Sequence, residues 1–344
     1  MTILGIESSC DETSASIVED GRRVRSLVIA SQSEIHARYH GVVPEVASRA
    51  HVEHIEPVVR EAISQAGCVL SDLDGIAVTN RPGLSGSLAV GLTFAKALAF
   101  ARAVPFVAVD HMQAHAYAAR LALPLEEDLE YPYLVLLVSG GHSMIAVSRG
   151  ETELEVLGTT IDDACGEAYD KVSVYLGAGY PGGPQVDRLA QEGDPRAFRF
   201  PVPKLNRANQ RYDMSFSGLK TAVVHQLERF RQPGYEWTRE NVAAAFQDAA
   251  VSILMRRLEN AIEDTGIRRV AAGGGVAANQ ELRTRLSALR NGDTPVQVVI
   301  PPIELCMDNG AMVAGVGYHL LVRGEVSRWD TGVSARVAAF RGTA

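Results

Sequence analysis

The stretch that decides the fold lies at residues 2–30, "TILGIESSCDETSASIVEDGRRVRSLVIA". An apolar run is followed by a small polar turn, a second run, a "DG" turn and a third run, and this order predicts a meander of three strands. Residues 133–161, "YLVLLVSGGHSMIAVSRGETELEVLGTTI", have the same order with "SGGH" in the first turn. Because the whole unit recurs, the sequence indicates a duplicated chain.

Each meander is followed by helical patterns and then by two apolar strands. In the first half, apolar residues recur at helical spacing within 48–67, namely Val52, Ile55, Val58, Val59, Ala62, Ile63 and Ala66. In the second half, similar stretches lie near 164–176 and 241–265. The expected closing strands are 73–79 and 104–110 in the first half, and 267–274 and 296–302 in the second. We therefore expect an α/β fold of two similar lobes, although two unrelated α/β domains would give some of the same patterns.

The length of 344 residues, 47% of them hydrophobic, is enough for two buried cores. We expect a first lobe at 1–130 and a second at 131–307, with a C-terminal helix at 308–344 that packs back on the first lobe. The second lobe includes a basic insertion at 196–231. A nucleotide and a metal ion are expected in a cleft between the lobes.

The composition excludes several classes of protein. No signal peptide and no run of eighteen apolar residues is present, so we expect a cytoplasmic protein without a membrane span. The four cysteines, scattered without a CxxC pair, argue against a disulfide framework or a thiolate zinc site. A net charge of −8 does not favour nucleic-acid binding by overall charge, so such contact requires a local patch or a partner.

Two histidines, His111 and His115, follow an apolar run and begin a helical pattern. Four residues apart on a helix, they share one face with β-carbons about 5–6 Å apart. If the halves face each other about a pseudo-twofold axis, the loop at 301–319 brings Asp308 to them. Two imidazoles and one carboxylate suit one divalent transition metal ion, with iron favoured and zinc as the alternative. Ordinary hydrogen-bonded histidines and a helix-capping Asp308 are the alternatives.

Four small-residue loops could hold a nucleotide, although the absence of Gly-Lys excludes a Walker A motif. They lie at 7–13, 139–143, 166–187 and 271–282. Backbone N–H groups in such loops can converge on phosphates, and Asp170 and Asp187 could hold ribose hydroxyls. Tight hairpins and packing glycines would explain the same loops.

Ten motifs in one order resemble the tRNA threonylcarbamoyladenosine-forming transferases over residues 3 to 318. They are "GIESSCDET", "GVVPEVASRAHV", "PGLSGSLAVG", "DHMQAHAYA", "LVSGGHS", "DDACGEAYDKV", "YPGGPQVD", "DMSFSGLKTA", "GGGVAAN" and "CMDNGAM". The resemblance implies the duplicated fold of actin, heat-shock chaperone ATPases and sugar kinases. It also implies transfer of threonylcarbamoyl from threonylcarbamoyl-AMP to the exocyclic amine of the adenosine 3′ of the anticodon, in tRNAs reading codons that start with A, with release of AMP.

The resemblance further implies roles for individual residues. The metal ligands would be His111, His115 and Asp308. The nucleotide ligand (threonylcarbamoyl-AMP, AMP or ATP) would contact Leu137, Val138, Ser139, Gly140, Gly141, Asp170, Gly183, Asp187 and Asn279. Asp11 and Glu12, in the turn of the first lobe, are our candidates for proton transfer. Expected partners are tRNA, a catalytically inactive actin-like paralogue and a small P-loop ATPase.

Four other functions compete with this one. A metallopeptidase is disfavoured because HMQAH lacks the glutamate that HExxH enzymes use as general base. An actin-like ATPase is disfavoured because Mg-ATP sites prefer oxygen ligands, and a nucleotide-binding scaffold would not need the paired histidines. A carbamoyl transferase acting on another acceptor stays open at this point.

Contact with tRNA would depend on the basic insertion at 196–231. It holds eight Lys or Arg against Asp213 and Glu228, with Phe198, Phe200, Tyr212 and Phe216 interleaved. Cations that meet phosphates and aromatic rings that stack on bases are how single-stranded RNA is held. A solvated basic loop, or a docking surface for an acidic partner, would have the same composition.

Overall fold

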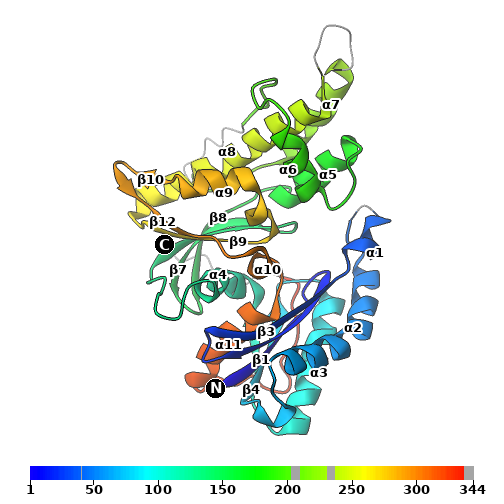
Figure 1. Cartoon of the computed structure of the whole chain (residues 1–344), viewed down its shortest axis with the longest axis vertical. Coiled ribbons are helices and arrows are strands. Elements are labelled where there is room, and N and C mark those ends of the chain that lie inside the picture. The colour runs from blue at the N-terminus through cyan, green and yellow to red at the C-terminus, as the bar shows by residue number, and fades with distance from the viewer. Residues whose placement is uncertain (40, 203–209, 231–236, 337–344) are drawn as a thin grey trace. The chain divides into compact units, whose positions relative to one another are not determined.

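The computed structural model describes residues 1–39, 41–202, 210–230 and 237–336. The chain forms two compact units (Figure 1). Unit 1 comprises residues 1–131, 148–154 and, within the described part, 301–336; unit 2 comprises residues 132–147 and 155–300.

Unit 1 is built on a five-stranded sheet in the order β3-β2-β1-β4-β5. Its first three strands form the antiparallel meander predicted from residues 2–30, and β4 and β5 then add in parallel to β1. The carboxyl ends of β1, β4 and β5 therefore lie at the same edge of the sheet, where α/β proteins place their ligands. The bounds are β1 (Thr2–Glu7), β2 (Glu12–Glu19), β3 (Arg23–Ser31), β4 (Gly75–Arg81) and β5 (Phe106–Asp110).

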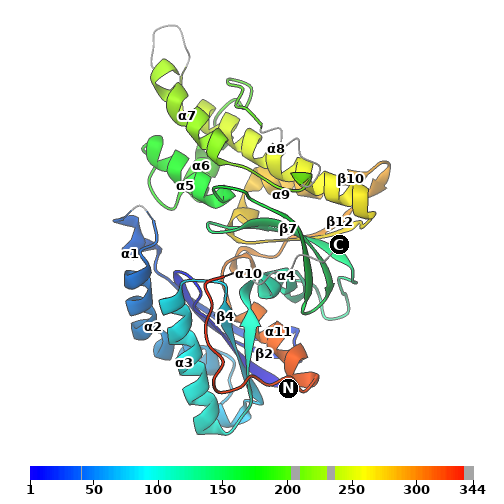
Figure 2. The same ribbon diagram turned by 180° about the vertical axis from the view of Figure 1, so that it is seen from behind.

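Helices cover both faces of this sheet, and strand β1 shows the alternation that this requires. Leu4 and Ile6 belong to a core shared with α2 (Pro44–Gln65) and α3 (Ser85–Arg102). Ile3 belongs to a second core shared with α4 (His111–Leu121) and α11 (Gly310–Val322). Figure 2 shows α2 and α3 side by side on their face of the sheet. The shorter elements are α1 (Ser33–Ala37), the 3₁₀ turn η1 (Leu70–Asp72) and α10 (Ile303–Cys306).

Gly5 explains how closely α11 approaches the sheet. A β-carbon at Gly5 would collide with the carbonyl oxygen of Gly310 and lie 2.6 Å from the amide nitrogen of Ala314. The first turn of α11 therefore rests directly on β1, which fixes the segment that precedes it, including Asp308.

The helix expected at 48–67 is present with different ends and a narrower apolar face. It begins at Pro44, a residue whose fixed φ and missing N–H suit the first helical turn. Ile55, Val58, Val59 and Ala62 are buried as predicted, but Val52 is 64% exposed. The prediction that Val52 lies on the buried face of this helix is therefore wrong.

Unit 2 repeats the architecture of unit 1. Its sheet has the order β12-β9-β6-β7-β8, which read backwards matches β3-β2-β1-β4-β5 strand for strand. Strands β6 and β12 both pair in parallel with β9. The duplication predicted from the two meanders is confirmed. The bounds are β6 (Tyr133–Val138), β7 (Ser143–Gly150), β8 (Glu153–Thr159), β9 (Arg269–Gly273) and β12 (Gln297–Val299).

Unit 2 contains the two helices that the sequence predicted, α5 (Cys165–Tyr175) and α8 (Arg239–Thr265). The others are α6 (Gly182–Gln191), α7 (Ser217–Phe230), the 3₁₀ turn η3 (Gly275–Ala278) and α9 (Gln280–Ser287). A short hairpin, β10 (Arg290–Asn291) and β11 (Thr294–Pro295), precedes β12.

The units group residues differently from the expected boundaries. Residues 148–154 belong with unit 1, where Gln113 donates to the carbonyl oxygen of Thr152 at 2.8 Å. Residues 301–307 belong there too. The expected C-terminal helix ends at Val322, because Gly324 adopts a φ of +75° that stops it. Beyond it, the amide of Ser327 donates to Phe106 of edge strand β5 at 3.0 Å.

In the described part of the chain, every helix is too short or too polar to cross a membrane.

Candidate metal centre and nucleotide loops

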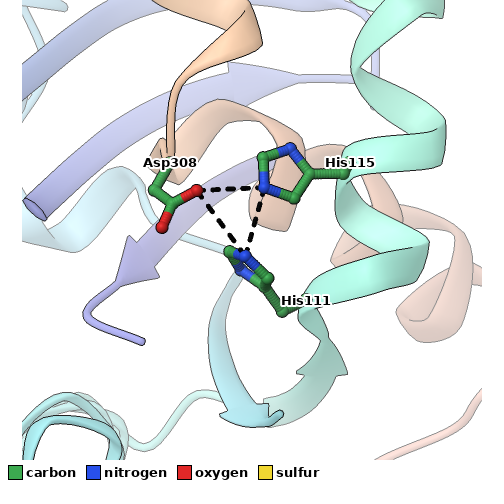
Figure 3. Close-up of side chains that lie close together, drawn as sticks. All are labelled: His111, His115 and Asp308. Carbon is green, nitrogen blue, oxygen red and sulfur yellow. Dashed lines mark hydrogen bonds and ion pairs between the residues drawn. The ribbon is translucent and has the colours of Figure 1, made fainter. Parts of the chain in front are cut away.

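Three side chains of unit 1 converge as the sequence predicted (Figure 3). His111 Nε2 and His115 Nε2 are 3.1 Å apart, and the Oδ1 atom of Asp308 lies 3.0 Å from His115 Nε2 and 3.6 Å from His111 Nε2. Both histidines are buried, and the Asp308 side chain is 18% exposed. The cluster is therefore open to solvent mainly on the Asp308 side.

Helix capping fixes where these side chains lie. Asp110 ends β5 and accepts hydrogen bonds from the amides of Met112 and Gln113 at 2.9 and 3.4 Å, so α4 begins at His111, directly at the carboxyl edge of the sheet. Asn309 caps α11 by accepting from the amide of Met312 at 3.0 Å. The alternative in which Asp308 is this cap is therefore wrong, and its carboxylate faces the histidines instead.

Glu7 contacts the Nδ1 atom of His111, on the side of the imidazole away from the cluster. Its Oε2 atom lies 3.0 Å from His111 Nδ1 and accepts from the hydroxyl of Thr79 at 2.6 Å, while its Oε1 atom accepts from the amide of Ser9 at 2.6 Å. The Ser9 hydroxyl is a further neighbour of His111 Nδ1 at 3.3 Å. Glu7 is fully buried. The imidazole is thus oriented by groups from β1 and β4.

The charges around the cluster act in opposite directions on the two histidines. Burial alone would lower the pKa of His111, but the negative charges of Asp308 and Glu7 outweigh it and raise the pKa to about 9. Burial and the neighbouring His111 lower the pKa of His115. Burial alone would raise the pKa of Glu7, but His111 holds it below its ordinary value.

These residues fit a transition metal ion. Ligand atoms bound to one ion at about 2.0–2.2 Å lie roughly 3–3.5 Å from one another, which the three atoms nearly match. Without an ion, two imidazole nitrogens and a carboxylate oxygen face one another. Protons on the nitrogens can form hydrogen bonds with only some of these lone pairs. The Nδ1 atom of His115 is also buried without a hydrogen-bond partner among the described residues. A cation bound by the two Nε2 atoms and Asp308 Oδ1 would satisfy the three converging atoms, whereas Nδ1 of His115 lies on the other side of its ring.

Asp11 ends the turn from β1 to β2 and Glu12 is the first residue of β2, also in unit 1. Glu12 is buried, and burial followed by the charges of Asp11 and Asp308 raises its pKa well above the ordinary value. Asp11 is only partly buried. The imidazole of His51 braces this turn, because its two nitrogens bond the Thr13 hydroxyl at 2.7 Å and the Cys10 carbonyl oxygen at 3.0 Å.

The residues expected to bind the nucleotide all lie in unit 2. Leu137 and Val138 are buried at the end of β6, so only their backbone can meet a ligand. Ser139, Gly140 and Gly141 form the next turn, which is partly buried at Ser139 and exposed at both glycines. A β-carbon at either glycine would have open space around it.

Two further segments pack against this turn. The amide of Gly166, in the first turn of α5, donates to the carbonyl oxygen of Ser139 at 3.2 Å, and a β-carbon there would lie 2.8 Å from Gly140. Gly274, with a φ of +83°, packs on the backbone of Val138. The turn after β6, the start of α5 and the glycine-rich loop after β9 therefore meet in one place.

The other predicted nucleotide residues form two bonded groups. The Asn279 amide donates to Asp187 at 2.8 Å and to Gln247 at 2.7 Å, and burial raises the pKa of Asp187. Asp170 accepts from the amide of Gly182 at 2.6 Å, which anchors the first turn of α6 where Gly183 follows. These side chains thus have structural hydrogen bonds that a ligand would have to share or replace.

The basic insertion is less basic than its composition indicates. Arg211 pairs with Asp264 and Glu263, and Lys220 pairs with Asp163. Phe200 and Phe216 are buried, so they cannot stack on a base. Arg207 lies outside the described residues. Arg196 and Arg199 are exposed.

Sequence reasoning missed Glu7, Thr79 and His51 as part of this site. Glu7 carried the clearest signal, because a carboxylate directly after the apolar run "ILGI" ends a buried strand. The hydrogen bond of Thr79 to Glu7 joins residues 72 positions apart, and local pattern does not show such a pair.

Solved structures similar to the chain show its fold. Component A of the (R)-2-hydroxyglutaryl-CoA dehydratase of Acidaminococcus fermentans is 13% identical, with a TM-score of 0.57, and the match covers 94% of this chain and 99% of that one. HypF of T. kodakarensis is 14% identical, with a TM-score of 0.63, over 95% of this chain and 49% of that one. The fold is the actin-like fold predicted from the sequence.

Sequence comparisons extend over nearly the whole chain. A protein named tRNA N6-adenosine threonylcarbamoyltransferase from Treponema denticola is 52% identical, covering 99% of this chain and 98% of its own. A protein of the same name from Caldicellulosiruptor bescii is 48% identical over 96% of each. The sequence profile of the TsaD family, tRNA N6-adenosine threonylcarbamoyltransferase, matches residues 23–315. The chain belongs to the family of tRNA N6-adenosine threonylcarbamoyltransferases.

Proposed function

We propose that the chain transfers the threonylcarbamoyl group from threonylcarbamoyl-AMP to the N6 amine of the adenosine 3′ of the anticodon in tRNA. Membership of the family supports the transfer and the tRNA substrate. The amine nitrogen forms a bond to the carbamoyl carbon, the bond from that carbon to the phosphate oxygen breaks, and AMP leaves. The amine loses one proton in the process.

The observation that carries the proposal is the convergence of His111, His115 and Asp308. These residues would hold a divalent transition metal ion, with iron favoured over zinc. When bound, the ion supplies a Lewis acid that can polarise a carbonyl oxygen. Two nitrogen ligands and one oxygen ligand do not suit magnesium, so an ATPase is not favoured.

The turn at 139–141 would receive the adenylate. Its exposed glycines allow a phosphate to approach the backbone N–H groups, and the first turn of α5 beside it adds the positive end of a helix. Asp187 would exchange its hydrogen bond with Asn279 for ribose hydroxyls, with Asp170 and Gly183 beside α6 as further ribose contacts. Asn279 would then lie near the adenine or the phosphate.

Asp11 and Glu12 would divide the proton chemistry between them. Burial and the charges of Asp11 and Asp308 raise the pKa of Glu12, which favours its protonated form, and a protonated Glu12 would donate a hydrogen bond to an oxygen on which negative charge develops. Asp11, which is nearer to solvent, is the candidate to accept the proton that the amine releases. Because tRNA is the substrate, we infer a cytoplasmic location, with an inactive actin-like paralogue and a small P-loop ATPase as partners.

The test separates the metal centre from the nucleotide loops. His111→Ala should remove the metal and abolish transfer, whereas Asp187→Ala should weaken AMP binding and leave the metal in place, since the two residues lie in different units. Metal is measured by elemental analysis, AMP affinity by calorimetry, and the modified nucleoside by mass spectrometry of tRNA. Full transfer by metal-free wild-type protein would contradict the proposed role of the centre.

A further inference from the structure

Glu7 is a buried carboxylate that the proposed reaction does not use. It ends β1, is fully buried, and lies on the same face of the strand as Ile3, toward α4 and α11. Its partners come from three places in the chain, namely Ser9 in the following turn, Thr79 on β4 and His111 on α4.

The hydrogen bonds to Glu7 determine its protonation. The Ser9 amide and the Thr79 hydroxyl each donate at 2.6 Å, and donors of this kind stabilise the ionised form. An ionised carboxylate only accepts, so His111 must present the proton on Nδ1 to the Oε2 atom 3.0 Å away.

This proton decides what the other nitrogen of His111 can do. In a neutral imidazole, a proton on Nδ1 leaves the lone pair on Nε2, which points at His115 and Asp308. His115 has no comparable support, since its Nδ1 atom is buried without a partner among the described residues. Of the two histidines, only His111 is therefore oriented by a carboxylate, through its contact with Glu7.

We propose that Glu7 is a positioning residue for the metal ion: it fixes the Nδ1–H tautomer and the ring plane of His111, so that Nε2 is presented as a ligand. The inference rests on the proposed function, because it takes the three-residue cluster as a metal site. Glu7 does not belong to the cluster itself, and it acts on the ion only through His111. Carboxylate partners of this kind typically change metal affinity 10–100-fold.

The test compares two isosteric variants by titration of the metal-free full-length protein with Zn²⁺ in competition with a chelator. Glu7→Gln should weaken Zn²⁺ binding by about 10–100-fold, since an amide can also bond His111 in the wrong tautomer. Glu19→Gln is the matched control. It makes the same change on β2 of the same unit, at a carboxylate that pairs with Arg25 and lies outside the cluster, so it should leave the affinity within about twofold.

A second measurement does not depend on any variant. Nitrogen-15 chemical shifts of the imidazole of His111 in the Zn²⁺-loaded wild-type protein should show Nδ1 protonated and Nε2 without a proton. Thr79→Val should give a smaller loss of affinity than Glu7→Gln, because it removes one donor to Glu7 and keeps the carboxylate. It serves as the test variant if Glu7→Gln does not fold.

The outcomes separate this inference from the proposed function. Zn²⁺ affinity unchanged in Glu7→Gln, or a proton found on Nε2 of metal-loaded His111, overturns the role of Glu7 while the metal site stands. Wild-type protein that binds no Zn²⁺ at the cluster overturns the metal site and this inference with it.

Discussion

At the scale of single residues, two buried glutamates five positions apart have pKa values shifted in opposite directions. Burial alone would raise the pKa of Glu7, but His111 and the hydroxyl of Thr79 lower it. Burial raises the pKa of Glu12, and the carboxylates of Asp11 and Asp308 raise it further. Because burial acts in the same direction on both residues, the neighbouring charges and donors account for the opposite shifts.

This difference predicts a stabilising substitution. In the unfolded chain, Glu12 ionises near pH 4.3, whereas in the folded chain it stays protonated to a higher pH, so stability is lost as pH rises above the unfolded value. Glu12→Gln removes this loss. We expect its Tm to exceed that of the wild type at pH 7–8 by a few degrees, at roughly 2–4 °C per kcal/mol, and the gain to vanish near pH 4.

Calorimetric scans of both chelator-treated proteins from pH 4 to pH 8 measure this difference. Glu7→Gln is the control of opposite sign, because it removes an ionised, hydrogen-bonded carboxylate and should lower Tm at pH 7. A Tm difference between Glu12→Gln and wild type that does not change with pH would show that the fold does not raise the pKa of Glu12.

At the scale of elements, helix α4 carries both histidine ligands, and its last turn is held by an arginine. Arg120 bonds Asp128 at 2.6 and 2.9 Å, the Tyr131 hydroxyl at 2.7 Å and Glu151 at 3.2 Å. Its guanidinium lies 5.4 and 4.9 Å from the ring centres of Tyr117 and Tyr131. The end of α4 opposite to the metal site is thus fixed by charge and stacking.

Arg120→Leu should therefore destabilise unit 1 by on the order of 2–3 kcal/mol, since it leaves the partners of a largely buried guanidinium unpaired. Half-exposed Asp128 recovers part of its hydration, which keeps the loss below that of a fully buried pair. Urea unfolding followed by circular dichroism measures it. Arg60→Leu is the matched control, because Arg60 and Glu56 form an exposed pair within α2 and its loss should cost under about 0.5 kcal/mol.

Patterns within single elements made much of the fold predictable. The two meanders, α5, α8 and the placement of His111 and His115 at a helix start follow from local periodicity. The non-helical segment after Val322 did not, because Gly324 sets the end of the helix and pairing with β5 sets the path beyond it. The bonds of Glu7 and Arg211 also escaped prediction, since their partners are distant in sequence.

At the scale of the whole molecule, duplication gave two equivalent turns with different chemistry. The turn after β1 carries Asp11, is followed directly by Glu12 at the start of β2, and lies in the unit that holds the metal cluster. The equivalent turn after β6 carries Ser139, Gly140 and Gly141, which leave the backbone exposed. One copy of the fold therefore offers charged side chains, and the other offers backbone donors at the same topological position.

An acidic chain must also bind tRNA, and the ion pairs in the basic insertion determine which of its cations are available to contact phosphates. Arg211 and Lys220 are neutralised by carboxylates, whereas Arg196 and Arg199 are exposed at the start of the basic insertion. Charge reversal of Arg196 and Arg199 to glutamate should weaken tRNA binding. It should also reduce the dependence of log K on log salt by roughly 0.7–0.9 for each phosphate that the protein no longer neutralises.

Arg211→Glu should weaken tRNA binding less than Arg196→Glu or Arg199→Glu does. The guanidinium of Arg211 is already paired with Asp264 and Glu263. Fluorescence anisotropy between about 50 and 200 mM salt measures both quantities. Reversal of Arg23 and Arg328 in unit 1 is the control, since it changes net charge equally at exposed sites on the other unit. If this control flattens the salt dependence as much as reversal of Arg196 and Arg199, overall charge and not the basic insertion governs tRNA binding.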